Sequence, residues 1–257
     1  MKTIVEIYNY REMIFGLVRR DLRGRYKGSF FGFLWTFINP LLQLGVYTIV
    51  FSVIMRAGIE KYYLFLFVAL IPWIFFSTSV AGGTTCVLAQ KNLVTKIRFP
   101  RQVLPIAFVT TNFVNMLLCF IVVLSVCAID NGLNVSLLPY LVPVMLIEYC
   151  LAMGICFIVS GITVYFRDLE HIISIFTMLW QFMTPIMYNV DAVPQEIRGY
   201  FMLNPMTPII MAYRDILYYK QAPEMQSLIM SFTMGFVFLW CGWSLFEHLQ
   251  KHFAEEL

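Results

Sequence analysis

Residues 34–55 read LWTFINPLLQLGVYTIVFSVIM, an uncharged stretch that follows the basic stretch RRDLRGRYKG at 19–28. A helix needs about 20 predominantly apolar residues to cross the hydrocarbon core of a bilayer, so this stretch is predicted to span it. Five more such stretches follow, at about 62–80, 103–129, 137–164, 172–190 and 228–246. The sequence therefore predicts an all-α membrane protein with six transmembrane helices.

The composition agrees with this class of protein. The 257 residues are 60% hydrophobic and only 13% charged, whereas soluble domains carry about 25% charged residues. An ordinary water-soluble enzyme, a disordered chain, a nucleic-acid-binding module and a secreted disulfide scaffold are all excluded. The six cysteines contain no CxxC pair and are expected to pack as small apolar residues.

The distribution of basic residues predicts the orientation. If the N-terminus is cytoplasmic, 13 of the 18 Lys and Arg residues fall in the inner segments, as the positive-inside rule requires. Both termini are therefore expected to face the cytoplasm. We divide the chain into a cytoplasmic segment, 1–33, and a transmembrane domain, 34–257.

Residues 4–27 have the pattern of one amphipathic helix lying at the cytoplasmic membrane surface. Its apolar stripe comprises Tyr8, Phe15, Val18, Leu22 and Tyr26, and its basic flank comprises Arg19, Arg20, Arg23 and Lys27. The alternative is that these bases only set the orientation of the first span.

The loop at 81–102 carries four basic residues and no acidic residue. A short helix is predicted from about Thr85 to Ile97, ended by Pro100. Its apolar residues are more numerous than a solvated loop requires, so we interpret it as a docking helix for a soluble partner; they are Val87, Leu88, Leu93, Val94 and Ile97. Orientation by positive charge is again the alternative.

The external segment at 191–227 is predicted to hold two helices too short to cross the membrane. One runs from Pro194 to Met202, and the other begins at Thr207-Pro208 and runs to about Tyr219, with Asn204-Pro205 between them. We expect a paired lid over an exit, whose charged residues face a vestibule or lipid headgroups; they are Arg198, Arg214 and Asp215. In that position Arg214 is expected to meet phosphate on a lipid-linked substrate. The alternative is a partly buried cap whose charges pair locally.

Two aromatic stripes at helical spacing mark the first and fifth spans. They comprise Phe33, Phe37, Leu44, Tyr47 and Phe51 on one span, and Ile172, Phe176, Trp180, Met183 and Met187 on the other. Helix packing explains many such stripes. They also suit an aromatic-lined conduit, because ring faces can stack on sugar rings without holding a sliding polymer at fixed sites.

The sequence contains no phosphate-binding loop of the form G-x-x-x-x-G-K-[ST] and no hydrolase or metalloprotease motif. The chain is therefore not expected to hydrolyse ATP or to hold a metal or cofactor. Glu148 is the one charge within the third and fourth spans and is expected to be a hydrogen-bonded carboxyl rather than a proton relay. A membrane enzyme acting on a lipid-linked sugar remains an alternative, with Asp168, Glu170 and His171 as its candidate residues.

Five stretches of the sequence resemble the permease subunits of ABC-2 type exporters of polysaccharides and polyol phosphates, which include O-antigen, capsule and teichoic acid. They are RRDLRGRYKGSFFGFLWTFINPLLQLGVYTIVFSVIM at 19–55, KNLVTKIRFPRQVLPIA at 91–107, YFRDLEHI at 165–172, TPIMYNVDAVPQEIRGYFMLNPMTPII at 184–210 and AYRDILYY at 212–219. The resemblance covers essentially the whole chain in order.

The resemblance implies a homodimer in the bacterial cytoplasmic (inner) membrane, joined to two copies of a separate ATPase that binds ATP and Mg²⁺. The implied substrate is a lipid-linked glycan, and the alternative within transport is a small amphiphile or drug; membrane lipids surround the dimer and no nucleic acid is involved. The implied site residues form three groups: ATPase coupling by Arg19, Arg23, Lys91, Leu93, Val94, Lys96 and Arg98; conduit lining by Phe33, Phe37, Tyr47, Phe51, Phe176, Trp180, Met183 and Met187; and an external gate of Arg198, Asn204, Pro205, Pro208, Arg214 and Asp215.

Overall fold

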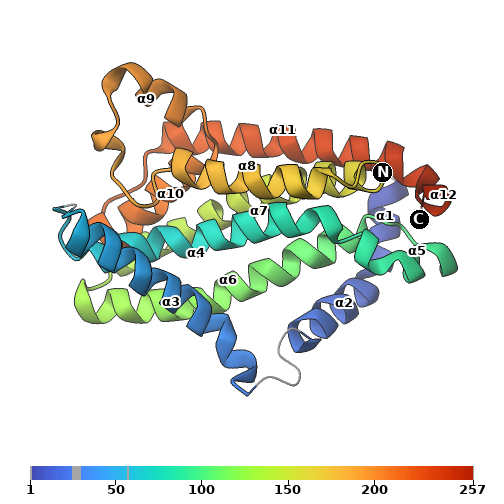
Figure 1. The fold of residues 1–257 in the computed structure, drawn as a ribbon, viewed down its shortest axis with the longest axis horizontal. Coiled ribbons are helices and arrows are strands. Elements are labelled where there is room, and N and C mark those ends of the chain that lie inside the picture. The colour runs from blue at the N-terminus through green and yellow to red at the C-terminus, as the bar shows by residue number, and fades with distance from the viewer. Residues whose placement is uncertain (1, 25–29, 57, 257) are drawn as a thin grey trace.

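The computed structural model describes residues 2–24, 30–56 and 58–256, and this part of the chain is helical and contains no strand (Figure 1). The α-helices are α1 Lys2–Asn9, α2 Arg11–Gly24, α3 Trp35–Thr48, α4 Tyr62–Ala81, α5 Lys91–Lys96, α6 Val103–Asp130, α7 Leu141–Thr163, α8 Leu169–Met183, α9 Gln195–Met202, α10 Met206–Arg214, α11 Met225–Leu249 and α12 Phe253–Glu256. π-Helical turns extend α3 over Ile49–Ile54 and α10 over Asp215–Tyr219. Short 3-10 turns occur at Gly32–Leu34, Gly82–Thr85, Leu88–Gln90, Val135–Tyr140, Val190–Ala192 and Gln250–His252.

Five helical segments in the described part of the chain are long and apolar enough to cross a membrane. They are Gly32–Ile54, Tyr62–Thr85, Val103–Asp130, Val135–Thr163 and Met225–His252. Their positions confirm five of the six predicted stretches. The agreement follows from the absence of charge in these stretches, since a long apolar run has no other stable solution than a helix in lipid.

The predicted fifth span, 172–190, is wrong at its C-terminal end. Helix α8 stops at Met183 and has 15 residues, a length of roughly 22 Å. Thr184 has an extended backbone, as expected for a residue that precedes proline. The chain then turns, and Ile186 and Met187 lie buried beyond the end of the helix.

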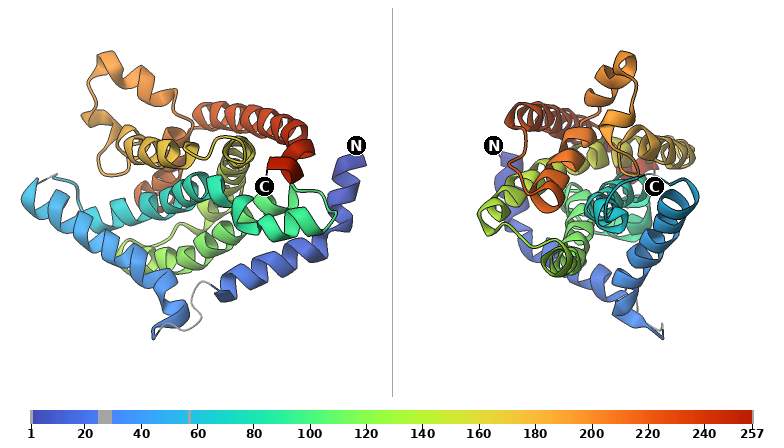
Figure 2. Two further views of the ribbon diagram at one scale, coloured as in Figure 1. Left: turned by 45° about the vertical axis from the view of Figure 1, so that its right-hand side comes forward. Right: turned by 90° about the vertical axis from the view of Figure 1, so that its left-hand side faces the viewer.

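Helix α4 forms the centre of the bundle. Fifteen of its 20 residues are buried, and it contacts α3, α6, α7, α8 and α10. Helices α7 and α11 make the most extensive helix pair in the described part of the chain. Helix α3 is different, because Thr36 and Pro40 are its only buried residues. It is inclined away from the bundle at its N-terminal end (Figures 1 and 2).

The N-terminal segment forms two helices, α1 and α2, rather than the single helix predicted over 4–27. The break lies at Tyr10. Helix α2 packs on α6 and buries Leu17 and Val18, so part of the predicted apolar stripe contacts the chain itself. Residues 25–27 of the predicted helix lie outside the described residues. Helices α1, α5 and α12 lie together at one end of the bundle, and α9 lies at the other (Figure 1).

Candidate functional site

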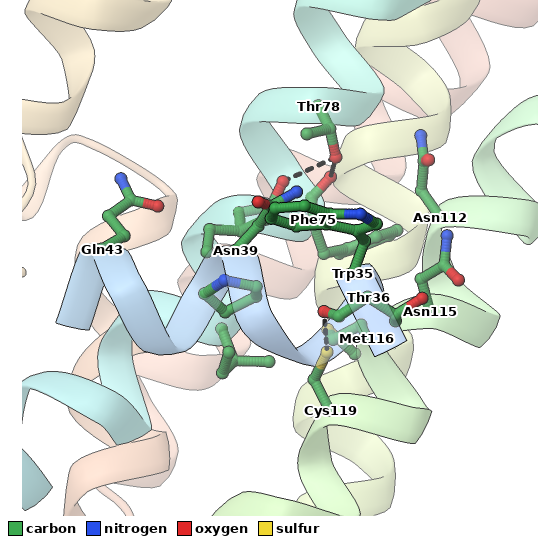
Figure 3. Close-up of a pocket in the computed structure, with 13 residues that line it drawn as sticks. Trp35, Thr36, Asn39, Gln43, Phe75, Thr78, Asn112, Asn115, Met116 and Cys119 are labelled. Carbon is green, nitrogen blue, oxygen red and sulfur yellow. Dashed lines mark hydrogen bonds between the residues drawn. The ribbon is translucent and has the colours of Figure 1, made fainter. Parts of the chain in front are cut away.

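A cavity of about 260 Å³ lies between α3, α4 and α6 (Figure 3). None of the residues that line it is charged. They are Trp35, Thr36, Asn39, Pro40 and Gln43 from α3, Ile71, Ile74, Phe75 and Thr78 from α4, and Asn112, Asn115, Met116 and Cys119 from α6. The cavity therefore offers amides, hydroxyls and an indole ring inside an apolar helical bundle.

Some of these polar groups are already engaged and others are not. Thr78 Oγ1 donates to the Ile74 carbonyl at 2.6 Å, and Cys119 Sγ donates to the Thr36 carbonyl at 3.4 Å. The Asn115 amide and the Thr36 hydroxyl are buried without a hydrogen-bond partner. Buried amides without partners are unusual in proteins. The cavity therefore has hydrogen-bonding capacity for a polar, uncharged guest.

A second cavity, of about 320 Å³, continues from the first between α4 and α8. The two share Gln43, Ile74 and Thr78, and the second adds Trp73, Ser77, Ala81, Ser174, Thr177, Met178 and Gln181. We call the joined surface the polar groove. Its polar side chains are those of Thr36, Asn39, Gln43, Ser77, Thr78, Asn112, Asn115, Ser174, Thr177 and Gln181.

Tyr47 connects α3 to α8 beside this groove. Its hydroxyl accepts from Gln43 Nε2 at 3.2 Å on its own helix and from Gln181 Nε2 at 3.3 Å on α8. Tyr47, a member of the first predicted stripe, thus links α3 to α8 within a single chain.

Trp180 links α8 to the segment at 191–227. Its Nε1 donates to Asn204 Oδ1 at 2.9 Å, and its ring packs edge-on against Phe76 and Phe176 with centroid distances of 5.0 and 5.2 Å. Asn204 Nδ2 in turn donates to Thr184 Oγ1 at 2.9 Å. The predicted Asn204-Pro205 break is therefore tied directly to the end of α8.

The remaining predicted conduit residues differ in exposure. Phe37 and Phe51 are half-buried, whereas Phe33, Phe176 and Met183 are about half exposed. Met187 does not belong to this face, because α8 ends before it and its side chain is buried, while its carbonyl accepts from the Tyr62 hydroxyl at 2.8 Å. The structure therefore removes Met187 from the predicted lining.

Sequence reasoning missed the polar side chains of the groove. The signal was present, since Asn39 and Gln43 on α3 are four residues apart, and Ser174, Thr177 and Gln181 on α8 recur at intervals of three and four. This spacing places each set on one side of its helix.

The segment at 191–227 has two short helices, α9 and α10, as predicted. Helix α10 begins at Met206 rather than at Pro208, and the Met206 N–H donates to Asn204 Oδ1 at 3.0 Å. Arg198 pairs with the Asp191 carboxylate at 3.4 Å and donates to the Asp191 carbonyl at 3.0 Å. These contacts favour local pairing of charge in this segment.

Asp215 lies where α10 changes into a π-turn. Partial burial raises the pKa of its carboxyl, and the hydrogen bond from Gln221 Nε2, at 2.7 Å, opposes that shift. The Asp215 carboxylate thus accepts a hydrogen bond from a residue six positions along the chain.

Arg214 does not face a vestibule, contrary to the prediction. Its side chain is only 3% exposed and donates to carbonyls of four other residues: Pro185 at 2.6 Å, Phe65 at 3.3 Å, Tyr188 at 3.4 Å, and Ile186. Its guanidinium carbon also lies 3.5 Å from the centroid of the Phe65 ring. The guanidinium is occupied by the chain itself, which leaves it unavailable for a phosphate.

The predicted ATPase-coupling residues fall in two places. Lys91, Lys96 and Arg98, in and after α5, are exposed at the end of the bundle that holds α1, α5 and α12, whereas Arg19 and Arg23 are exposed on α2, which runs away from that end (Figure 1). The helix predicted over 85–97 is shorter, since α-helix is confined to Lys91–Lys96.

The two apolar residues of α5 differ in burial. Leu93 is half-buried, whereas Val94 is 2% exposed, and α5 contacts α12. Val94 is therefore part of the protein's own core and is not available for docking. Leu93 remains a candidate.

Residues 12–218 match the family described as "ABC-2 type transporter". Over its whole length the chain is 39% identical to the "O-antigen export system permease protein RfbA" of Myxococcus xanthus, all of which it covers. It is also 31% and 32% identical to two proteins of the same name from Klebsiella pneumoniae, over 96% of this chain and 95% of each relative. The chain therefore belongs to the ABC-2 type transporter family.

Proposed function

We propose that the chain is the membrane-spanning permease subunit of an ATP-driven exporter that moves a lipid-linked polysaccharide of the O-antigen type across the bacterial inner membrane. The names of the three relatives support this function. The observation in the molecule that carries it is the polar groove, which has amides, hydroxyls and aromatic rings and no charged side chain. Such a surface can hydrogen-bond to sugar hydroxyls and stack on sugar rings, and it does not trap a polymer by charge.

The membrane arrangement is part of the proposal. Helix α8 is the fifth of six crossings and is shortened on its outer side, where residues 184–190 and the external segment complete it. Both termini face the cytoplasm, in agreement with the basic residues of the inner segments. Helices α1, α2, α5 and α12 then lie on the cytoplasmic side, and α9 and α10 form the external gate.

The active unit is a homodimer with two copies of a separate ATPase, which binds ATP and Mg²⁺. The exposed apolar side chains of α3 and α8 support the homodimer, since each groove is open on one side and a facing copy would close it into a conduit. The ATPase docks where exposed basic residues surround Leu93 on α5. Residues 1–33 form the cytoplasmic segment of the permease, and 34–257 its transmembrane domain.

The test is export in living cells. The chain and its cognate ATPase are placed in a strain that makes O-antigen but lacks its exporter, and surface glycan and cytoplasmic lipid-linked glycan are measured separately. The proposed function predicts that the intact pair restores surface glycan and that loss of either chain leaves the glycan inside. If the glycan reaches the surface without the chain, or the chain alone modifies it, the proposal is wrong.

Groove variants test the path. Gln43→Leu and Gln181→Leu remove two amides from the groove, and Gln226→Leu makes the same change at an exposed position on α11 outside it. One hydrogen bond contributes about 1 kcal/mol, and about 1.4 kcal/mol is a factor of ten, so the double groove variant should slow export by roughly tenfold or more. The Gln226→Leu control should export normally. If the double groove variant exports as fast as the control, the glycan does not pass along the polar groove.

A further inference from the structure

A third cavity, of about 460 Å³, lies between α1, the turn that leads into α6 and the residues that follow α11. We call it the terminal cavity. It is lined by Glu6 of α1, by Arg98, Arg101 and Gln102 in the turn that leads into α6, and by Lys251 after α11. It shares none of its lining residues with the polar groove. Three separate parts of the chain thus converge on it.

The terminal cavity has an excess of positive charge. Arg98, Arg101 and Lys251 contribute three cations, and Glu6 contributes one carboxylate. None of these four side chains takes part in the ion pairs found among the described residues. Gln102 precedes the first residue of α6, so the positive end of a 28-residue helix dipole adds to the attraction for an anion. The electrostatics favour a negatively charged ligand.

The base of the cavity holds polar atoms without partners. The Gln102 side chain is fully buried, and neither its Nε2 nor its Oε1 has a hydrogen-bond partner. The buried Nε of Arg101 also lacks one. A buried donor or acceptor without a partner destabilises a protein. Two donors and one acceptor at the base of a cationic cavity therefore indicate a bound group that supplies both acceptors and a hydroxyl donor.

We propose that the terminal cavity binds the diphosphate group of a ligand at the cytoplasmic surface. Phosphate oxygens accept hydrogen bonds from the Arg101 and Gln102 donors and pair with Arg98 and Lys251 at the rim. A hydroxyl of the sugar next to the diphosphate, or a water molecule, donates to Gln102 Oε1. The ligand has two sources, the headgroup of a lipid-linked glycan and a soluble diphosphate.

This inference rests on the proposed function for the side of the membrane and for the lipid-linked source. Its position agrees with both, because the cavity lies at the ends of two long apolar helices, α6 and α11, where lipid headgroups would lie. Arg98, predicted to couple to the ATPase, is then a ligand-binding residue.

The experiment measures binding to the full-length chain, purified in detergent, without transport. Three probes are used: farnesyl diphosphate, with farnesol as its uncharged match; inorganic pyrophosphate; and vesicles containing phosphatidylglycerol. The proposal predicts binding of farnesyl diphosphate but not of farnesol. If pyrophosphate binds as tightly as farnesyl diphosphate, the cavity recognises the diphosphate alone; if farnesyl diphosphate binds more tightly, the lipid chain contributes.

Two variants are compared with a matched control. Arg98→Gln combined with Lys251→Gln removes two rim charges, and Gln102→Leu removes the buried amide at similar volume. Charge-assisted hydrogen bonds contribute enough that the dissociation constant should rise by roughly tenfold or more in both. Arg11→Gln combined with Arg167→Gln removes two exposed cations that do not line the cavity, and the constant should change less than about twofold, within the range of exposed charge effects.

Several results would overturn the proposal. They are equal binding by the rim variant and the control, binding of phosphatidylglycerol vesicles without binding of either diphosphate, and crosslinking of Arg98 or Lys251 positions to acidic residues of the ATPase with no anion bound. Melting temperatures without ligand show whether a variant is folded, and a loss of binding counts only where the melting temperature is kept. Normal export by a chain that binds no diphosphate refutes this inference alone, whereas diphosphate binding without export refutes the proposed function.

Discussion

Replacing Gly154 by alanine should separate the two most extensively packed helices of the protein. A Cβ atom at Gly154 on α7 would lie 2.4 Å from Leu239 N and from the Phe238 carbonyl carbon on α11. At Gly242 on α11, it would lie 2.2 Å from the Gly154 carbonyl oxygen. The opposing atoms are backbone, so no side chain can rotate out of the way. The two glycines thus allow α7 and α11 to touch along their backbones, as small residues do between membrane helices.

The size of the effect follows from the shortfall in distance. Ordinary carbon contacts are about 3.5–4.0 Å, so the helices must move apart by about 1 Å, and a gap of that size forfeits roughly a quarter to a half of each dispersion contact. Overpacking of a core costs about 1–3 kcal/mol of stability. Because the neighbouring atoms are rigid backbone, Gly154→Ala should cost about 3 kcal/mol, the upper end of this range. The double variant with Gly242→Ala should cost less than the sum, because the first methyl already separates the helices.

The assay is thermal unfolding of the purified chain in detergent, together with its yield in the membrane fraction. Gly45→Ala is the control, because Gly45 lies within α3 and nothing approaches its Cβ position within 4 Å. Alanine there should be neutral or stabilising by up to about 1 kcal/mol, owing to its higher helix propensity. If the Gly154→Ala protein has the same melting temperature as the wild type, α7 and α11 do not touch along their backbones at this position.

Three further predictions concern single side chains. Glu148→Gln should keep the melting temperature within a few degrees and keep the pH profile of export, because an amide oxygen still accepts from the Tyr213 hydroxyl, which is 2.7 Å from Glu148 Oε2. Glu148→Leu leaves that buried hydroxyl unpaired and should lower the free energy of unfolding by about 1–3 kcal/mol. Arg214→Lys should lower stability by several kcal/mol and reduce membrane yield, since three donors cannot replace the guanidinium fork, and unchanged yield would contradict the carbonyl contacts. Leu93→Asp should reduce export at normal yield if α5 docks the ATPase, whereas Val94→Asp should prevent folding because it buries a charge; normal export by Leu93→Asp would assign this loop to orientation alone.

The spans could be predicted from the sequence because their signal is local. An uncharged run of about 20 apolar residues satisfies its backbone only as a helix in lipid, and the run from Tyr62 to Val80 predicts helix α4 without knowledge of its neighbours. The end of α8 at Met183 also has a local signal, because Thr184 precedes Pro185 and the residue before a proline is disfavoured in a helix. The prediction followed the apolar residues beyond the proline instead and therefore ended the helix too late.

The polar groove could not be predicted as a site, because it depends on packing. Asn39, Thr78, Asn115 and Gln181 come from four helices that are far apart in the sequence, and each residue alone is an ordinary neutral side chain in an apolar segment. The aromatic residues were predicted to line the conduit instead, because they recur at helical spacing and their ring faces can stack on sugar rings. Burial of Val94 was equally hidden, since the residues of α12 that cover α5 lie at the opposite end of the chain.

Arg214 explains why α8 can end early within an apolar environment. Beyond Met183 the chain leaves the helix, and the carbonyls of Pro185, Ile186 and Tyr188 lose the N–H partners that a continuing helix would supply. In lipid such groups must be satisfied within the protein, and Arg214 donates to all three. A single guanidinium, with five donors in a fixed fork, thus replaces about one turn of helical hydrogen bonding. A charged residue in an apolar segment can therefore serve the backbone of a distant loop, and only the position of that loop distinguishes this role from binding a substrate phosphate.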